Sequence, residues 1–139
     1  MEKYCNLNDV PINRSGFRIS SDFPFLGCSP DGVLFDQHEN IIKIIEIKCP
    51  YGFKDYTLED IKGSKEFYMK YNDDTNDFTL KQSHIYFYQV QGILNIMNVA
   101  ECDFVVYTPN NDLIIETIKK IQNFGRTICC LFLKTFGVI

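Results

Sequence analysis

Four polar side chains in this chain could do chemistry together: two carboxylates, a lysine and an amide. Asp31 lies in a Ser-Pro-Asp-Gly turn, Glu46 and Lys48 belong to one Glu-Ile-Lys run, and Gln89 lies in a helical stretch. Two carboxylates, together with a strand carbonyl, offer the hard oxygen ligands that suit Mg²⁺ or Mn²⁺. A lysine beside them could offset charge at a phosphate under attack. The set therefore indicates metal-assisted phosphodiester chemistry.

The Glu-Ile-Lys run closes an isoleucine-rich stretch, residues 41–48, that we predict to be a β-strand. β-Branched residues fill both of its faces, so we expect a central strand that is covered on both sides. The strand ends before Pro50, because proline cannot continue a central ladder. Residues two apart face the same side of a strand, so Glu46 and Lys48 should project together.

Each motif also has a plain structural interpretation. A strand emerging into water would give the same acid–lysine pair, and the run Asp60-Ile61-Lys62 repeats the pattern by chance. Most Ser-Pro-Asp-Gly sequences are only turns. However, fifteen residues separate Asp31 from Glu46, and a polar turn at 36–40 lies between them. This is hairpin spacing, so both carboxylates could reach one end of a sheet.

The amide lies in a predicted helix that begins after Ser83 as N-cap and runs to about residue 97. At helical spacing, Gln89 shares one face with Ile85, Gly92, Ile93 and Ile96. This face predicts a buried amide, which needs partners that a hydrated metal site would supply. A surface glutamine is the alternative. Gln91 points elsewhere and is predicted to be structural, and His84 is predicted to cap the helix or lie at the surface. Tyr86 and Tyr88 are predicted to be packing residues, and the alternative is that either borders a DNA channel.

The other segments predict a sheet with short connections. Further strands are expected at 16–20, 33–35, 100–108 and 113–118. The rest is predicted as a short helix at 58–61, an exposed loop at 71–77, a turn at 109–112, and a C-terminal helix from 119 interrupted by Gly125.

Length and composition bound the class of protein. With 139 residues, the chain is long enough for one domain with a real core, and 45% hydrophobic with 14% aromatic content argues against disorder. A net charge of −4 gives no bulk signature of a nucleic-acid binder. The six cysteines include no C-x-x-C pair, so their spacing predicts neither a zinc site nor a disulfide framework. With no signal peptide or bilayer-length apolar run, an intracellular location, in nucleus or cytoplasm, is expected.

Three ordered runs together resemble the YqaJ viral recombinase family, the phage lambda exonuclease-like branch of the PD-(D/E)xK nucleases. They are Phe25–Val33, Ile45–Tyr51 and His84–Gly92, the last followed by the strand Cys102–Thr108. The resemblance extends roughly from Gly16 to Ile118, and three motifs in order are far more specific than any one of them.

The resemblance implies an α/β fold with a restriction-endonuclease-like core, a mixed β-sheet with flanking helices. It implies that Asp31, Glu46 and the backbone carbonyl of Ile47 bind Mg²⁺, with Mn²⁺ as the alternative. Lys48 would orient the attacking water and offset charge, and Gln89 would help to place the water. The implied reaction is phosphodiester hydrolysis of DNA, often as processive digestion of one strand for recombination. The implied partners are DNA, further copies of the chain, and a single-strand annealing protein, with no membrane.

Two departures from the family shape the expected organisation. The family carries a helical segment with basic DNA contacts before the Ser-Pro-Asp-Gly motif, and this sequence has no evident counterpart. The resemblance also ends after Ile118, since the last stretch does not match the closing helix of the family. We therefore expect an N-terminally truncated core, divided into an irregular lead-in at 1–15, a nuclease-like core at 16–118 and a divergent tail at 119–139. The alternatives are a catalytically weak or inactive nuclease-like module that binds DNA or a partner, and a globular domain with an accidental motif match.

Overall fold

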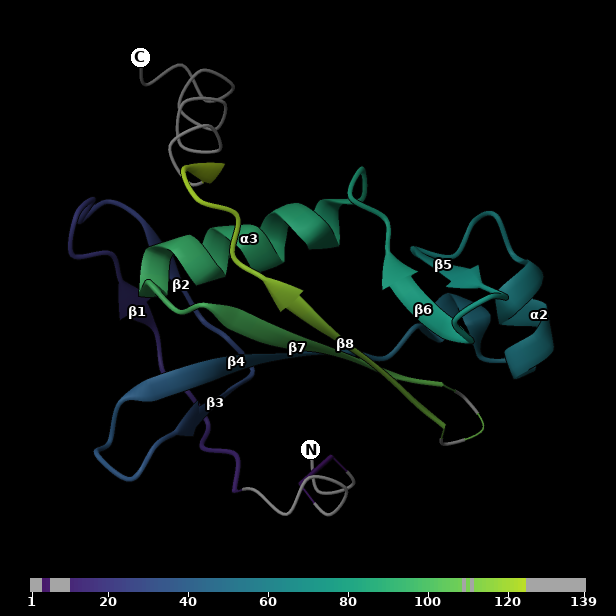
Figure 1. Cartoon of the computed structure of the whole chain (residues 1–139), viewed down its shortest axis with the longest axis horizontal. Helices are drawn as coiled ribbons and strands as arrows, with labels where there is room; N and C mark the ends of the chain where they lie inside the picture. Colours follow the sequence, from purple (N-terminus) through teal and green to yellow (C-terminus); the bar gives the residue numbers. More distant parts are fainter. Residues whose placement is uncertain (1–3, 6–10, 109, 111, 125–139) are drawn as a thin grey trace.

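The isoleucine-rich strand is an inner strand of a four-stranded sheet. The structure is a computed structural model, and it describes residues 4–5, 11–108, 110 and 112–124. In this sheet β4 (Ile41–Lys48) lies between β3 (Gly32–Phe35) and β7 (Glu101–Tyr107), and β8 (Leu113–Lys119) forms the far edge (Figure 1). The β4–β7 pair is parallel and the other two pairs are antiparallel. The expected mixed sheet is therefore confirmed.

Both faces of β4 are covered, as its composition predicts. Ile44 and Ile45 point to opposite faces and are both fully buried. The pairing with β3 ends where Gly32 lies opposite Ile45, whereas the pairing with β7 continues to Lys48. The last three residues of β4 thus extend past the start of β3, which leaves that edge of the strand open.

Helix α3 (Ile85–Met97) packs across one face of the sheet (Figure 1). Its side chains Phe87, Val90 and Leu94 join the larger core cluster, together with sheet residues such as Phe104. The predicted N-cap at Ser83 is wrong by one residue. His84 is the N-cap, and its Nδ1 accepts a hydrogen bond from the Tyr86 N–H at 3.2 Å.

The opposite face of the sheet carries a smaller core cluster. Leu34, Ile45 and Val105 pack there with Tyr4 from the N-terminal segment. The backbone of Asn13 also pairs with that of Val33, with N···O distances of 3.1 and 2.9 Å. Residues near the N-terminus thus help to cover this face.

The segment between β4 and α3 is more ordered than the sequence suggests. It contains η1 (Tyr51–Phe53), α2 (Leu58–Gly63), β5 (Met69–Asn72) and β6 (Asp77–Leu80). The short helix is confirmed, but the predicted loop at 71–77 is wrong at both ends, because β5 and β6 pair as an antiparallel hairpin. Asparagine and aspartate are depleted in strands, so the polar residues at 72–77 indicated a loop although the ends of that stretch belong to β5 and β6.

A second small hairpin precedes the turn that contains Asp31. The strand predicted at 16–20 is only Arg18–Ile19 (β1), and it pairs with β2 (Gly27–Cys28), which the sequence did not indicate. The C-terminal helix predicted from 119 is wrong at its start, because Lys119 ends β8 and residues 120–123 are not helical; the part from Gly125 on lies outside the described residues, as do positions 109 and 111 of the predicted turn. Across the described ranges, no helix combines the length and apolarity needed to cross a bilayer.

Candidate active site

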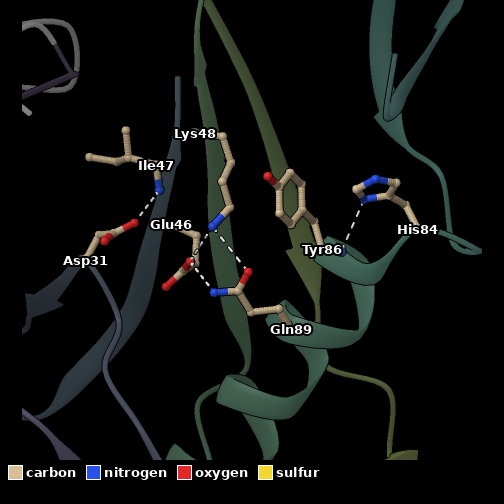
Figure 2. A network of polar contacts seen from close by, with 7 residues as sticks. All are labelled: Asp31, Glu46, Ile47, Lys48, His84, Tyr86 and Gln89. Carbon is tan, nitrogen blue, oxygen red and sulfur yellow. Dashed lines mark hydrogen bonds and ion pairs between the residues drawn. The ribbon is translucent and has the colours of Figure 1, made fainter. Parts of the chain in front are cut away.

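The open edge of β4 is occupied by the side chain of Asp31. This residue directly precedes β3, and its Oδ2 accepts a hydrogen bond from the Ile47 N–H at 2.8 Å (Figure 2). The N–H and C=O of one strand residue point to the same edge of the strand. The Ile47 carbonyl therefore faces the edge where the Asp31 carboxylate lies.

Glu46, Lys48 and Gln89 form a closed triangle on the α3 side of the sheet. Glu46 Oε2 accepts hydrogen bonds from Lys48 Nζ and from Gln89 Nε2, each at 3.3 Å. Gln89 Oε1 accepts a third hydrogen bond from Lys48 Nζ at 3.2 Å. Figure 2 shows strand and helix meeting through these three side chains. Strand alternation places the acid and the lysine on one face, and α3 supplies the amide.

Glu46 lies in an unfavourable position for an isolated carboxylate. It is only 2% exposed, and burial raises its pKa above the ordinary value for glutamate. The Asp31 carboxylate raises the pKa further, while the Lys48 ammonium opposes the shift. Its second oxygen, Oε1, is buried and has no hydrogen-bond partner among the described residues. Buried polar atoms are normally satisfied, so this oxygen lacks a positive or donating group.

A hard cation fits this donor set. The Asp31 carboxylate lies at the edge that carries the Ile47 carbonyl, and it is close enough to Glu46, whose Oε1 lacks a partner among the described residues, to raise the pKa of that carboxyl. In the part of the chain that the structure describes, no three His, Cys, Asp or Glu side chains gather as a metal cluster. Mg²⁺ usually keeps several waters and uses one or two carboxylates, whereas structural zinc requires four protein ligands. The residues therefore fit a hydrated magnesium-type ion rather than zinc.

One neighbour of the lysine was missed by the sequence analysis. Lys48 Nζ lies 4.7 Å from the centroid of the Tyr86 ring, within the range of a cation–π interaction. Tyr86 was predicted to be a packing residue or to border a DNA channel. The available signal was its position three residues before Gln89, because residues three apart lie on one side of a helix.

The two glutamines of α3 lie in different environments. Gln89 contacts the site but is exposed, so the prediction of a buried amide at this position is wrong. Gln91 is the fully buried amide. Its Nε2 donates to the Lys119 carbonyl at 2.8 Å and its Oε1 accepts from the Ile121 N–H at 2.9 Å. Its structural role is confirmed.

The chance motif of α2 takes no part in this arrangement. Asp60 forms a capping box with Thr57, and Lys62 pairs with Glu59 at 2.8 Å on the same short helix. The same acid-x-lysine spacing thus gives a helix cap in one place and a strand-end pair in the other.

A mixed sheet that carries a Glu-x-Lys strand end, with an adjoining aspartate and a covering helix, defines a restriction-endonuclease-like nuclease core. Residues 1–103 match the family model of the YqaJ-like viral recombinase domain. The chain belongs to the YqaJ-like viral recombinase family. No curated protein matches the sequence.

Solved structures of an alkaline exonuclease share the fold. The crystal structure of LHK-Exo from Laribacter hongkongensis and that of LHK-Exo in complex with dAMP each superpose with a TM-score of 0.67 at 21% sequence identity. Each match covers 99% of this chain and 62% of the exonuclease chain. The chain thus spans less than two thirds of the length of these relatives, and at this identity the likeness establishes the fold alone.

Proposed function

We propose that this chain is a metal-dependent DNA nuclease that hydrolyses phosphodiester bonds, of the exonuclease or recombination type. Family membership supports this class, and so does the contact of Glu46, Lys48 and Gln89 beside Asp31. The single observation that carries most weight is the orphaned Glu46 Oε1. A buried carboxylate oxygen without a donor is costly in a purely structural pair and is explained by a cation ligand.

Asp31, Glu46 and the Ile47 carbonyl would hold the cation, for which Mg²⁺ is our first choice and Mn²⁺ the alternative. When bound, such an ion supplies charge neutralisation at the phosphate and lowers the pKa of water. The Lys48 ammonium has three N–H donors, of which Glu46 and Gln89 accept two. The third can serve a water or a phosphate oxygen.

Gln89 contributes by fixing the other two side chains. Its amide donates to the Glu46 carboxylate and accepts from the Lys48 ammonium, so it bridges the two charged groups of the strand. The Glu46 carboxylate and the Lys48 ammonium are thereby oriented before any substrate arrives. Such preorganisation of charged groups is a major source of catalytic power.

The test is cleavage of an end-labelled linear duplex in Mg²⁺, Mn²⁺, Ca²⁺ or EDTA. We expect degradation in Mg²⁺ or Mn²⁺ only. Asp31→Asn and Glu46→Gln should each lower the rate by about 100-fold or more, because each removes a charged ligand. Asp60→Asn, in the chance motif, is the matched control and should cleave normally. Normal cleavage by either site variant would remove that residue from the proposed centre.

A nuclease-like module that binds DNA or a partner without cleaving is the second candidate. The net charge of −4 and the presence of only two carboxylates at the described site favour it. DNA retention in Ca²⁺ together with no degradation in Mg²⁺ or Mn²⁺ would support this candidate and contradict the nuclease.

A homo-oligomer and a single-strand annealing partner also stay proposals, drawn from the family. Light scattering of the purified chain tests the first. Co-purification with an annealing protein, compared with the chain alone, tests the second.

A further inference from the structure

We propose that Tyr68 and Tyr86 form an aromatic brace that positions the Lys48 ammonium, so that the segment between β4 and α3 serves the candidate site. The catalytic meaning of this brace rests on the proposed nuclease function, while its geometry does not. The brace links two distant parts of the chain, since Tyr68 lies between α2 and β5 and Tyr86 lies in the first turn of α3.

The first part of the brace is the contact between Tyr86 and Lys48. The ammonium lies 4.7 Å from the ring centroid, and it also donates to Glu46 Oε2 at 3.3 Å and to Gln89 Oε1 at 3.2 Å. Figure 2 shows the Tyr86 ring beside Lys48, on the side away from Glu46. A lysine side chain has four flexible carbons and therefore many accessible rotamers. The three separate contacts of the ammonium stabilise one of these rotamers over the others.

The second part is the packing that holds the Tyr86 ring. Tyr68 meets it edge to face, with ring centroids 5.1 Å apart and planes at 76°. The His84 ring lies at 4.7 Å and 67°, and Phe104 of β7 lies at 6.1 Å. His84 also accepts the backbone N–H of Tyr86. Aromatic pairs in this geometry are specifically attractive, so the ring is held from several directions.

Tyr68 is anchored deeply enough to act as a support. It is buried, and its ring also contacts Phe67 at 4.4 Å and Phe104 at 6.1 Å. Its hydroxyl is buried without a hydrogen-bond partner among the described residues. Burial raises the pKa of this hydroxyl, so it stays neutral. The hydroxyl thus contributes no polar contact to the brace, and the ring carries the packing.

Loss of the brace should lower the rate without weakening DNA binding. A freed ammonium spends less time where charge develops on the phosphate, so we expect kcat to fall by about tenfold in Tyr86→Leu, with KM almost unchanged. Tyr86→Phe keeps the aromatic face and should retain most of the wild-type rate. Tyr88→Leu is the matched control, because Tyr88 lies on the same helix and packs on Phe87 and Phe124 instead.

A spectroscopic signature tests the brace without any activity. An aromatic ring over Lys48 shifts its Hε signals upfield, and these can be followed by NMR in protein with ¹³C-labelled lysine, assigned with Lys48→Arg. We expect the upfield shift in the wild type, its loss in Tyr86→Leu and its reduction in Tyr68→Leu, where the Tyr86 ring is present but unsupported. Tyr86→Phe, Tyr68→Phe and Tyr88→Leu should keep the wild-type shift.

Three results would overturn the brace: unshifted Hε signals in the wild type, a wild-type shift in a folded Tyr68→Leu protein, or a lost shift in Tyr68→Phe. The first and third do not depend on the leucine variant, so they decide the matter even where Tyr68→Leu does not fold. A chain that cleaves no DNA under any condition contradicts the nuclease proposal, and the lysine spectrum then still decides the brace.

Discussion

The two glutamines of α3 allow structure and chemistry to be separated by the same substitution on one helix. Gln91 is fully buried and bonds two backbone groups at the end of β8, whereas Gln89 is exposed and bonds only side chains of the candidate site. We predict that Gln91→Leu destabilises the fold but leaves the candidate site intact. Gln89→Leu should leave the stability almost unchanged but lower the cleavage rate.

The magnitude for Gln91→Leu follows from its two lost hydrogen bonds. Leaving a buried donor or acceptor unpaired costs about 1–3 kcal/mol per group. The freed groups belong to Lys119 and Ile121, which are exposed and can partly rehydrate, so the lower part of that range applies. Leucine keeps most of the volume, so the cavity contribution is small. We expect a loss of about 2–3 kcal/mol, or roughly 6–10 °C in Tm for a domain of this size.

Urea unfolding followed by circular dichroism measures the first effect, and duplex cleavage per folded molecule measures the second. Gln89→Leu should change the free energy of unfolding by about 0.5 kcal/mol or less, because exposed substitutions rarely do more. Its cleavage rate should fall by about tenfold or more. Equal stability losses in the two variants, or a stable Gln91→Leu protein, would refute the assignment of the two environments.

Three further predictions concern stability. Lys43→Met should cost about 1–2 kcal/mol in urea unfolding, because Lys43 lies 3.1 Å from buried Asp103 and forms an ion pair with it, whereas Tyr4 and Thr117 donate only neutral hydroxyls to that carboxylate. An unchanged midpoint would contradict this. Burial raises the pKa of Glu116, so the contribution of this side chain to stability is present at low pH and is lost as the pH rises through that pKa. The stability of Glu116→Gln relative to wild type should therefore increase from pH 4 to pH 8. A difference that does not change with pH would argue against this. Burial lowers the pKa of His84, so the stability that its neutral ring confers is present above the ordinary histidine pKa and is lost as the pH falls through the lowered pKa. Asparagine can cap the helix but does not titrate, so His84→Asn should lose less stability than wild type between pH 8 and pH 5.

The elements that the sequence predicted well are those with one dominant pattern. The run 41–48 is β-branched on both faces, which describes a covered inner strand, and the structure has β4 at those residues. Strand alternation then fixes the common direction of Glu46 and Lys48. Their partner Gln89 was singled out because it shares a helical face with Ile93 and Ile96, although the burial predicted for its amide is wrong.

The misses arise where pattern was ambiguous. Apolar or aromatic residues occupy nine of the thirteen positions of α3 and lie on all sides of it, so helical spacing could not fix which face is buried. The buried residues are Phe87, Val90, Gln91, Ile93 and Leu94. Ile85, counted on the buried face, is 71% exposed because it lies in the first turn. The β5–β6 hairpin was hidden for a different reason, since only its two ends, at Met69 and Leu80, are buried. Tertiary contacts, rather than local preference, hold these segments.

The most direct test of the proposed nuclease compares two lysines that follow the same acid-x-lysine spacing. Initial rates of cleavage of one linear duplex in Mg²⁺ should be measured for Lys48→Ala, at the end of β4, and for Lys62→Ala, on the surface of α2. We expect Lys62→Ala to cleave like wild type and at least about 100-fold faster than Lys48→Ala. Active protein with a ratio near one would contradict the assignment of Lys48 and, with it, the proposed site.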